Sequence, residues 1–298
     1  MKFSLDHLPE RKRLELSRIV EIVHEEFEDA LKEGTADFKK KGRILKIILF
    51  GSYARGDWVD EENIGKGYKS DYDLLVIVNN RKLTNFGSYW RKAADRFPRI
   101  VKPPVSLNVH SLREVNTALK LGNYFFSEIR RDGIVLYELD DEELAEPKSL
   151  TPAEEYRVSQ QHFKRFQRAK KFLKGVRFYA SEGDMDEAAF LLHQAIEQAY
   201  STLLLTLTNY SPASHNLNHL RTLAEGRDRR LAEIWPQDRQ RYTAWFNIIN
   251  HAYVKARYSE HFKITEEALV WLGERTDALQ QLVKAICEEH IEKLRQKL

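Results

Sequence analysis

Hydrophobic positions change their spacing near the middle of the chain. In the first half, apolar residues recur at helical spacing from Leu16 to Leu31, and short β-type runs follow. Helical stretches at Phe86–Phe97 and Ser111–Arg131 separate some of these runs. The alternation predicts an α/β (α+β) unit with a small mixed sheet. The predicted strands are Ile44–Phe50, Leu74–Val78, Val105–Val109 and Ile134–Tyr137.

The second half shows no convincing strand pattern. Thr151-Pro152-Ala153-Glu154 combines an N-cap, a proline at the first helical position and a reciprocating glutamate, so we expect a helix to begin there. Helical periodicity then runs through about 152–180, 184–208, 215–225, 238–257 and 265–296, which predicts an all-α helical bundle. The acidic segment Asp140–Ser149 is the expected linker between domains at 1–145 and 150–298.

Composition is typical of an ordinary globular protein. The 298 residues are 42% hydrophobic and 31% charged, which suffices for two domains with their own cores. A net charge of +3 is too small for a dedicated binder of duplex DNA, so no such binding is expected. Cys287 is the single cysteine, so no disulfide can form within the chain. The N-terminal segment lacks the apolar core of a signal peptide. The apolar stretch Ile44–Phe50 is too short to span a bilayer. We therefore expect a cytoplasmic protein without a membrane segment.

A Gly-Ser pair directly follows the first predicted strand. Gly51 lets the backbone approach a phosphate closely, while Ser52 and the N–H groups of a helix that opens at Tyr53 or Ala54 donate to its oxygens. Arg55 adds a charge-assisted contact. These residues are candidates for nucleotide binding, although an ordinary strand–turn–helix corner has the same pattern.

Two aspartates lie two residues apart where the next strand begins. We expect Asp71 and Asp73 to project from one face of that strand. Neighbouring carboxylates repel each other unless a cation lies between them, so the pair predicts a site for Mg2+ or Mn2+. Solvated aspartates at a strand start are the alternative. Their place after the Gly-Ser turn and before Leu74–Val78 favours the functional interpretation.

These segments together resemble the polymerase-β-type nucleotidyltransferases, especially the minimal bacterial group, over roughly residues 40–140. That family has a hydrophobic strand, Gly-Ser, a spacer and Asp-hydrophobic-Asp-hydrophobic in this order. The resemblance implies that Gly51 and Ser52 bind a nucleoside triphosphate, ATP being expected, and that Asp71 and Asp73 are catalytic and hold magnesium. The implied reaction transfers a nucleoside monophosphate to an acceptor hydroxyl on a protein, an RNA end or a small molecule.

Two features depart from the family pattern. The spacer Tyr53–Ser70 is 18 residues long, and Asp57–Gly67 within it resembles an inserted loop. The family also places a third carboxylate on a neighbouring strand, whereas Val105–His110 contains no acid. Asn108 is the candidate neutral metal ligand there, with Glu114 on the following helix as an alternative. A catalytically weakened nucleotide-binding or regulatory module is therefore the alternative function.

The second half resembles the HEPN helical-bundle family over about residues 152–298. The likeness lies in Ala188–Tyr200, His215–Leu220 and Ala252–Tyr258. It implies a homo-oligomer, such as a dimer, that forms through the helical domain. Together with the first domain, it implies a toxin–antitoxin or defence setting.

Some HEPN proteins are ribonucleases with an Arg-x(4–6)-His motif, and that pattern is only partly present here. Phe246 stands where the arginine belongs, so a HEPN ribonuclease regulated by the first domain is a second alternative function. A nucleotide pocket built from aromatic and basic side chains is another interpretation. The alternative is that the tyrosines pack in the core and Arg257 forms an ion pair. The pocket candidates are Asn247, His251, Tyr253, Arg257 and Tyr258.

Overall fold

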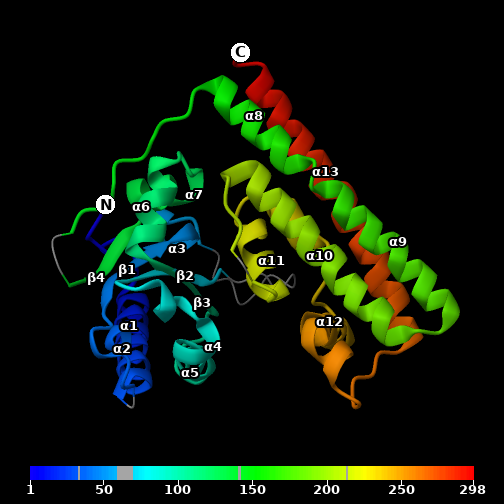
Figure 1. Ribbon diagram of the computed structural model, residues 1–298, viewed down its shortest axis with the longest axis horizontal. Coiled ribbons are helices and arrows are strands. Elements are labelled where there is room, and N and C mark those ends of the chain that lie inside the picture. Colours follow the sequence, from blue (N-terminus) through cyan, green and yellow to red (C-terminus); the bar gives the residue numbers. More distant parts are fainter. Residues whose placement is uncertain (33, 59–69, 140–141, 213) are drawn as a thin grey trace. The chain divides into compact units, whose positions relative to one another are not determined.

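The computed structural model describes residues 1–32, 34–58, 70–139, 142–212 and 214–298. The described residues up to Ser149 form one compact unit, and those from Leu150 onward form a second (Figure 1). Most of the predicted loop Asp57–Gly67, and the first two residues of the predicted linker, lie outside the described residues. Among the helices of the described residues, none has an apolar stretch long enough to cross a membrane.

The first unit is a four-stranded mixed sheet with helices on both faces. The strand order is β3-β2-β1-β4, where β2 and β3 run parallel and the other neighbours antiparallel. In Figure 1, α1 and α2 lie on one side of the sheet, and α6 and α7 on the other. The strands are β1 (Ile44–Phe50), β2 (Tyr72–Val78), β3 (Val105–Ser111) and β4 (Ile134–Glu138). The helices are α1 (Glu10–Lys32), α2 (Asp37–Lys40), α3 (Gly51–Arg55), η1 (Arg81–Thr84), α4 (Phe86–Tyr89), α5 (Arg91–Arg96), η2 (Phe97–Arg99), α6 (Leu112–Lys120) and α7 (Tyr124–Asp132).

The strand predictions agree with the structure, but two predicted helical stretches are broken. The predicted helical stretch Ser111–Arg131 forms two helices, because Gly122 adopts a φ of +71° and Asn123 then caps α7. The stretch Phe86–Phe97 is likewise split into α4, α5 and η2. The sheet itself separates an apolar face, whose side chains pack against α1, from the face that carries the polar residues described below.

The second unit is a helical bundle around α10. This helix is buried on several sides and packs against α8, α9, α11, α12 and α13. The capping box of Thr151 and Glu154 that was expected to open the bundle is present. The predicted helix at 152–180 divides into two, α8 and α9. The elements are α8 (Pro152–Phe163), α9 (Phe166–Glu182), α10 (Met185–Thr208), α11 (Leu217–Glu225), η3 (Arg229–Glu233), α12 (Gln240–Tyr258) and α13 (Glu266–Arg295).

A buried polar cluster attaches the segment before α11 to α10. The Nδ1 atom of His215 in that segment lies 2.8 Å from a carboxylate oxygen of Glu197, which is buried on α10. One turn earlier on α10, the Nε2 atom of the fully buried His193 donates to the backbone oxygen of His215 at 3.0 Å. Burial lowers the pKa of His193 to about 4, so this side chain is neutral in the folded protein at pH 7.

We predict that His193 makes the helical unit lose stability as the pH falls below about 6.5. Below this pH the imidazole becomes protonated in the unfolded chain but stays neutral in the folded chain. A folded-state pKa about 2.5 below the unfolded-state value contributes about 3 kcal/mol to the free energy of unfolding. This contribution is fully present above pH 6.5 and is lost by pH 4. Urea denaturation of wild type and His193→Gln at pH 7.5 and 4.5 measures this. The free energy of unfolding of wild type minus that of His193→Gln should be about 2 kcal/mol smaller at pH 4.5 than at pH 7.5.

Substitution of the exposed His251 by glutamine provides the control, and this variant should follow the wild-type pH dependence. If wild type keeps its full advantage over His193→Gln at pH 4.5, the buried imidazole is not the group that couples stability to pH.

Candidate functional site

The turn after β1 lies directly against the carboxylate of Asp73. Phe50, the last residue of β1, pairs in register with Asp73 on β2. Gly51 follows with a φ of +74°, and a Cβ atom added there would lie 2.4 Å from Asp73 Oδ2. Only glycine fits this backbone and this approach. Two motifs that are 20 residues apart in the sequence therefore meet in space, and the helix begins at Gly51 rather than at Tyr53 or Ala54 as expected.

The two aspartates flank a residue that points into the core. Asp71 immediately precedes β2, Asp73 is its second residue, and both are partly exposed. Tyr72 between them is fully buried on the apolar face. Because side chains alternate along an extended chain, Asp71 and Asp73 project toward the opposite side, which is the side of the Gly51 turn.

Strand β3 brings polar side chains to the Asp73 face. Ser106 is aligned with Asp73, and Asn108 is aligned with Leu75, one side-chain step further along the strands. Aligned residues of neighbouring strands share a face, so both lie on the same face as Asp73. Asn108 is 3% exposed. The sheet register therefore places Ser106, not Asn108, directly beside Asp73.

Glu114 does not substitute for the third carboxylate. One of its carboxylate oxygens accepts a hydrogen bond from the backbone N–H of Ser111, which is aligned with Val78 at the far end of β2. The other oxygen lies 3.0 Å from Nε of Arg81. Val78 lies five residue steps along the strand from Asp73, a distance of about 16 Å. Among the described residues, no group of three His, Cys, Asp or Glu side chains has a geometry that could hold a metal.

Arg55 ends α3 and lies among acidic side chains. Its guanidinium is 3.4 Å from the carboxylate of Asp57, and its side chain is 35% exposed. It also helps to lower the pKa of Asp132, although a hydrogen bond from Arg131 is the main cause of that shift. Both acids compete with a phosphate for the charge of Arg55, and its contact with nucleotide stays a prediction.

The candidates on α12 divide into two groups. Asn247 and His251 are exposed, and His251 Nδ1 lies 2.8 Å from the backbone oxygen of Asn247. Phe246, at the position of the ribonuclease arginine, is instead buried in the bundle with its ring 4.7 Å from that of Trp235. Position 246 therefore belongs to the core, where it cannot present a charge to RNA.

The second group surrounds Tyr253. Its ring stacks on His215 at 3.6 Å between centroids, and the guanidinium of Arg257 lies 4.4 Å from the ring centre. Arg257 Nε also donates to the backbone oxygen of Tyr253, while Tyr258 is 75% exposed. Tyr253 is thus already engaged by two side chains of its own unit. Sequence reasoning missed Glu197 beneath this group, although an acid within the apolar run of α10 is a detectable signal.

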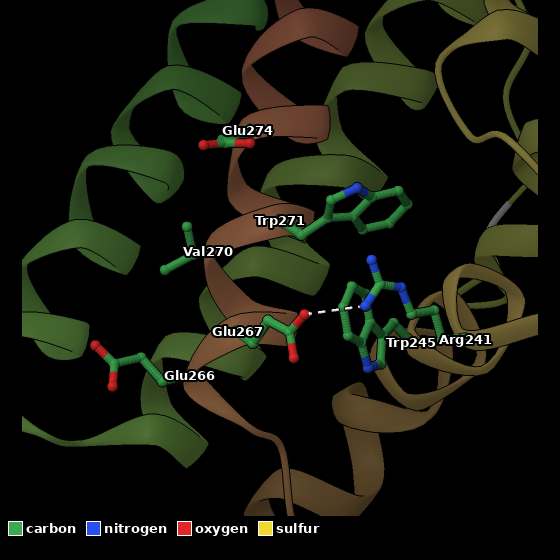
Figure 2. Close-up of a pocket in the computed structure, with 7 residues that line it drawn as sticks. All are labelled: Arg241, Trp245, Glu266, Glu267, Val270, Trp271 and Glu274. Carbon is green, nitrogen blue, oxygen red and sulfur yellow. Dashed lines mark hydrogen bonds and ion pairs between the residues drawn. The ribbon is translucent and has the colours of Figure 1, made fainter. Parts of the chain in front are cut away.

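A pocket of about 380 Å³ lies between α12 and α13 (Figure 2). Arg241 on one wall points toward Glu267 on the other, at 3.2 Å, and Trp245 and Trp271 complete the polar and aromatic lining. Three of its seven lining residues are glutamates, which repel a triphosphate. None of the sequence-predicted site residues lines this pocket.

Comparison with known proteins finds similarity to a curated protein and to a solved structure. A 52-residue stretch, 17% of this chain, is 50% identical to a putative protein adenylyltransferase of Methanocaldococcus jannaschii, and it spans 39% of that relative's length. The crystal structure of a nucleotidyltransferase-like protein from Exiguobacterium sibiricum aligns over 91% of this chain and 80% of its own, with 14% identity and a TM-score of 0.30.

Two family profiles match separate parts of the chain. Residues 35–142 match the family described as polymerase beta, nucleotidyltransferase. Residues 164–288 match the HEPN domain. The chain therefore combines a nucleotidyltransferase domain of the polymerase-β type with a HEPN domain.

Proposed function

We propose that the first unit transfers a nucleoside monophosphate, AMP from ATP, to an acceptor hydroxyl with the help of Mg2+ or Mn2+. The observation that carries this proposal is the contact between the Gly51 backbone and the Asp73 carboxylate. It brings a turn suited to phosphate and an acid suited to a metal into one site. The match to the nucleotidyltransferase family supports the class of reaction.

The turn binds phosphate through local donors. The backbone N–H groups of Gly51 and Ser52 and the Ser52 hydroxyl are the groups available at the start of α3. Because α3 has only five residues, these individual donors matter more than a helix dipole. The absence of a side chain at Gly51 lets a phosphate approach the backbone.

The acidic residues suit a hard divalent cation. Carboxylate oxygens are the ligands that Mg2+ prefers, and Mg2+ in phosphoryl-transfer sites is commonly held by one or two carboxylates together with substrate phosphates. Asp71 and Asp73 meet this requirement, and the amide oxygen of Asn108 on the same sheet face is a neutral addition. A bound cation there supplies charge neutralisation for the phosphates.

In the proposed reaction, the acceptor oxygen forms a bond to the α-phosphorus while the bond from that phosphorus to the bridging oxygen of the β-phosphate breaks. Pyrophosphate leaves, and the acceptor hydroxyl loses its proton. The chain's own part is to hold the α-phosphate between the turn and the acids, so that attack occurs from a fixed direction.

A protein side-chain hydroxyl is our first choice of acceptor. The relative from Methanocaldococcus jannaschii is named a putative protein adenylyltransferase, which supports this choice. An RNA end and a small molecule are the other acceptors that the assay below distinguishes. Assembly through the HEPN domain, a toxin–antitoxin or defence setting and a cytoplasmic location belong to the same proposal.

We predict that Asp71→Asn and Asp73→Asn each reduce label transfer by at least about 100-fold, because each removes a charge that the metal and phosphates require. The protein is incubated with ATP labelled at the α-phosphate, Mg2+ and cell extract, and the labelled products are separated into protein, RNA and small molecules. Asp95→Asn, on the exposed surface of the same unit, is the matched control and should retain full activity.

Equal transfer by wild type and both site variants would show that Asp71 and Asp73 do not form the site. Binding of ATP without any labelled product would instead favour the catalytically weakened module. RNA cleavage that persists in the aspartate variants and disappears in His251→Ala would favour the HEPN ribonuclease.

We predict that Gly51→Ala weakens Mg2+-dependent binding of a non-hydrolysable ATP analogue by at least about 10-fold, since the new Cβ must displace the Asp73 carboxylate. Gly183→Ala is the matched control, because Gly183 also has a positive φ, +85°, but has nothing within 4 Å of its Cβ position. Both variants should lose about 1–2 kcal/mol of stability from backbone strain.

Isothermal titration calorimetry compares the two alanine variants. Only Gly51→Ala should lose affinity for the analogue. An equal effect of both substitutions would mean that backbone strain, and not the approach to Asp73, controls binding.

A further inference from the structure

Two tyrosines next to the site residues in sequence meet on the core side of the site. Tyr53 follows Ser52 in α3, and Tyr72 separates Asp71 from Asp73. Both side chains are fully buried, and their ring centroids are 4.3 Å apart. The phosphate-binding turn and the acidic strand therefore touch on two sides, through Gly51 and Asp73 at the site and through these two rings beneath it.

An ion pair on α1, between the buried Lys12 and the partly exposed Glu15, joins the two rings. The ammonium of Lys12 donates to the Tyr53 hydroxyl at 3.3 Å and lies 5.4 Å and 5.7 Å from the ring centres of Tyr53 and Tyr72. The Tyr72 hydroxyl donates to Glu15 Oε2 at 2.7 Å, and that same oxygen is 3.8 Å from the Lys12 ammonium. The four side chains form a closed ring of contacts between α1, α3 and β2.

Stability alone is a poor explanation for this arrangement. Lys12 is 5% exposed, and moving its charge from water into the core costs free energy. A well-packed apolar side chain at the same position would not have this cost. Hydrogen bonds differ from apolar contacts because they are directional, so they fix where one element lies relative to another. Lys12 and Glu15 also precede residues 35–142, so the family match does not cover them.

We propose that Lys12 and Glu15 are positioning residues that hold the Gly51–Ser52 turn at a fixed distance from Asp71 and Asp73. They act through the hydroxyl groups of Tyr53 and Tyr72 and do not touch the reacting atoms. This inference rests on the proposed function, since it concerns the same nucleotide and metal site.

The test uses the full chain and two readouts. Calorimetry measures binding of α,β-methylene-ATP with and without Mg2+, and the label-transfer assay measures the rate. Tyr72→Phe removes one hydroxyl and keeps the ring, Lys12→Met keeps the length of the side chain and removes its charge, and Glu15→Gln is the mildest change. We expect about 10-fold weaker binding in Mg2+ and a 10- to 100-fold lower rate for Tyr72→Phe and Lys12→Met, because small displacements at a reacting site have effects of this size.

Trp90→Phe is the control for a loss of stability alone. It removes a buried hydrogen bond from the same core, in which Trp90 Nε1 donates to the Leu83 oxygen at 2.8 Å. Its melting temperature should fall as in Tyr72→Phe, while its Mg2+-dependent binding stays at the wild-type value. Tyr53→Phe combined with Tyr72→Phe should lose less affinity than the product of the two single effects, because both hydroxyls belong to one network.

The outcomes separate this inference from the proposed function. If wild type binds the analogue but transfers no label, the proposed reaction is wrong. The comparison of binding among the variants then still tests the positioning role. Variants with lowered melting temperatures and wild-type Mg2+-dependent affinity overturn the positioning role. Wild type that binds no analogue overturns both.

Discussion

The contact between the Gly51 backbone and the Asp73 carboxylate is the constraint on which the first unit depends. It requires a glycine with a positive φ directly after β1, and a register in which Phe50 lies opposite Asp73. A side chain at position 51 would force the carboxylate away from the turn. The candidate nucleotide site therefore lies where the end of β1 meets the beginning of β2.

Both units use buried charged or polar groups to attach a short segment to a helix. In the first unit, Lys12 and Glu15 on α1 bind the two tyrosines that lie beneath the candidate site. In the HEPN unit, Glu197 on α10 binds His215 in the segment before α11. Such groups are costly to bury, but their hydrogen bonds have direction, whereas apolar packing permits more sliding. Each network therefore fixes the position of a short segment relative to the helix that it contacts.

Local patterns in the sequence predicted most of the elements, and they also supplied the candidate site residues, which stay predictions. Ile44–Phe50 is an apolar run interrupted only by Lys46 and forms β1 with those bounds, and the Thr151 capping box opens the bundle as expected. The helix break at Gly122 was missed, because apolar residues continue at helical spacing on both sides of it. The HEPN likeness rests on segments of α10, of the beginning of α11 and of α12, and the family match agrees with it.

Features that depend on long-range pairing could not be predicted in the same way. Side-chain alternation puts Ser106 and Asn108 on one face of β3, but only the register with β2 shows that Ser106 lies beside Asp73. The same register removes Glu114 from the site. Lys12 gave no signal, since a lysine on an amphipathic helix is normally solvated and its burial depends on tyrosines 41 and 60 residues away.

A crystal structure with Mn2+ and α,β-methylene-ATP tests the central claim most directly, because anomalous scattering locates the metal without prior assumptions. The account predicts a Mn2+ peak in contact with the carboxylates of both Asp71 and Asp73, at about 2.0–2.3 Å. It also predicts a triphosphate bound by the backbone of Gly51 and Ser52. A metal bound away from these two acids, or a triphosphate held by the HEPN unit instead, would contradict it.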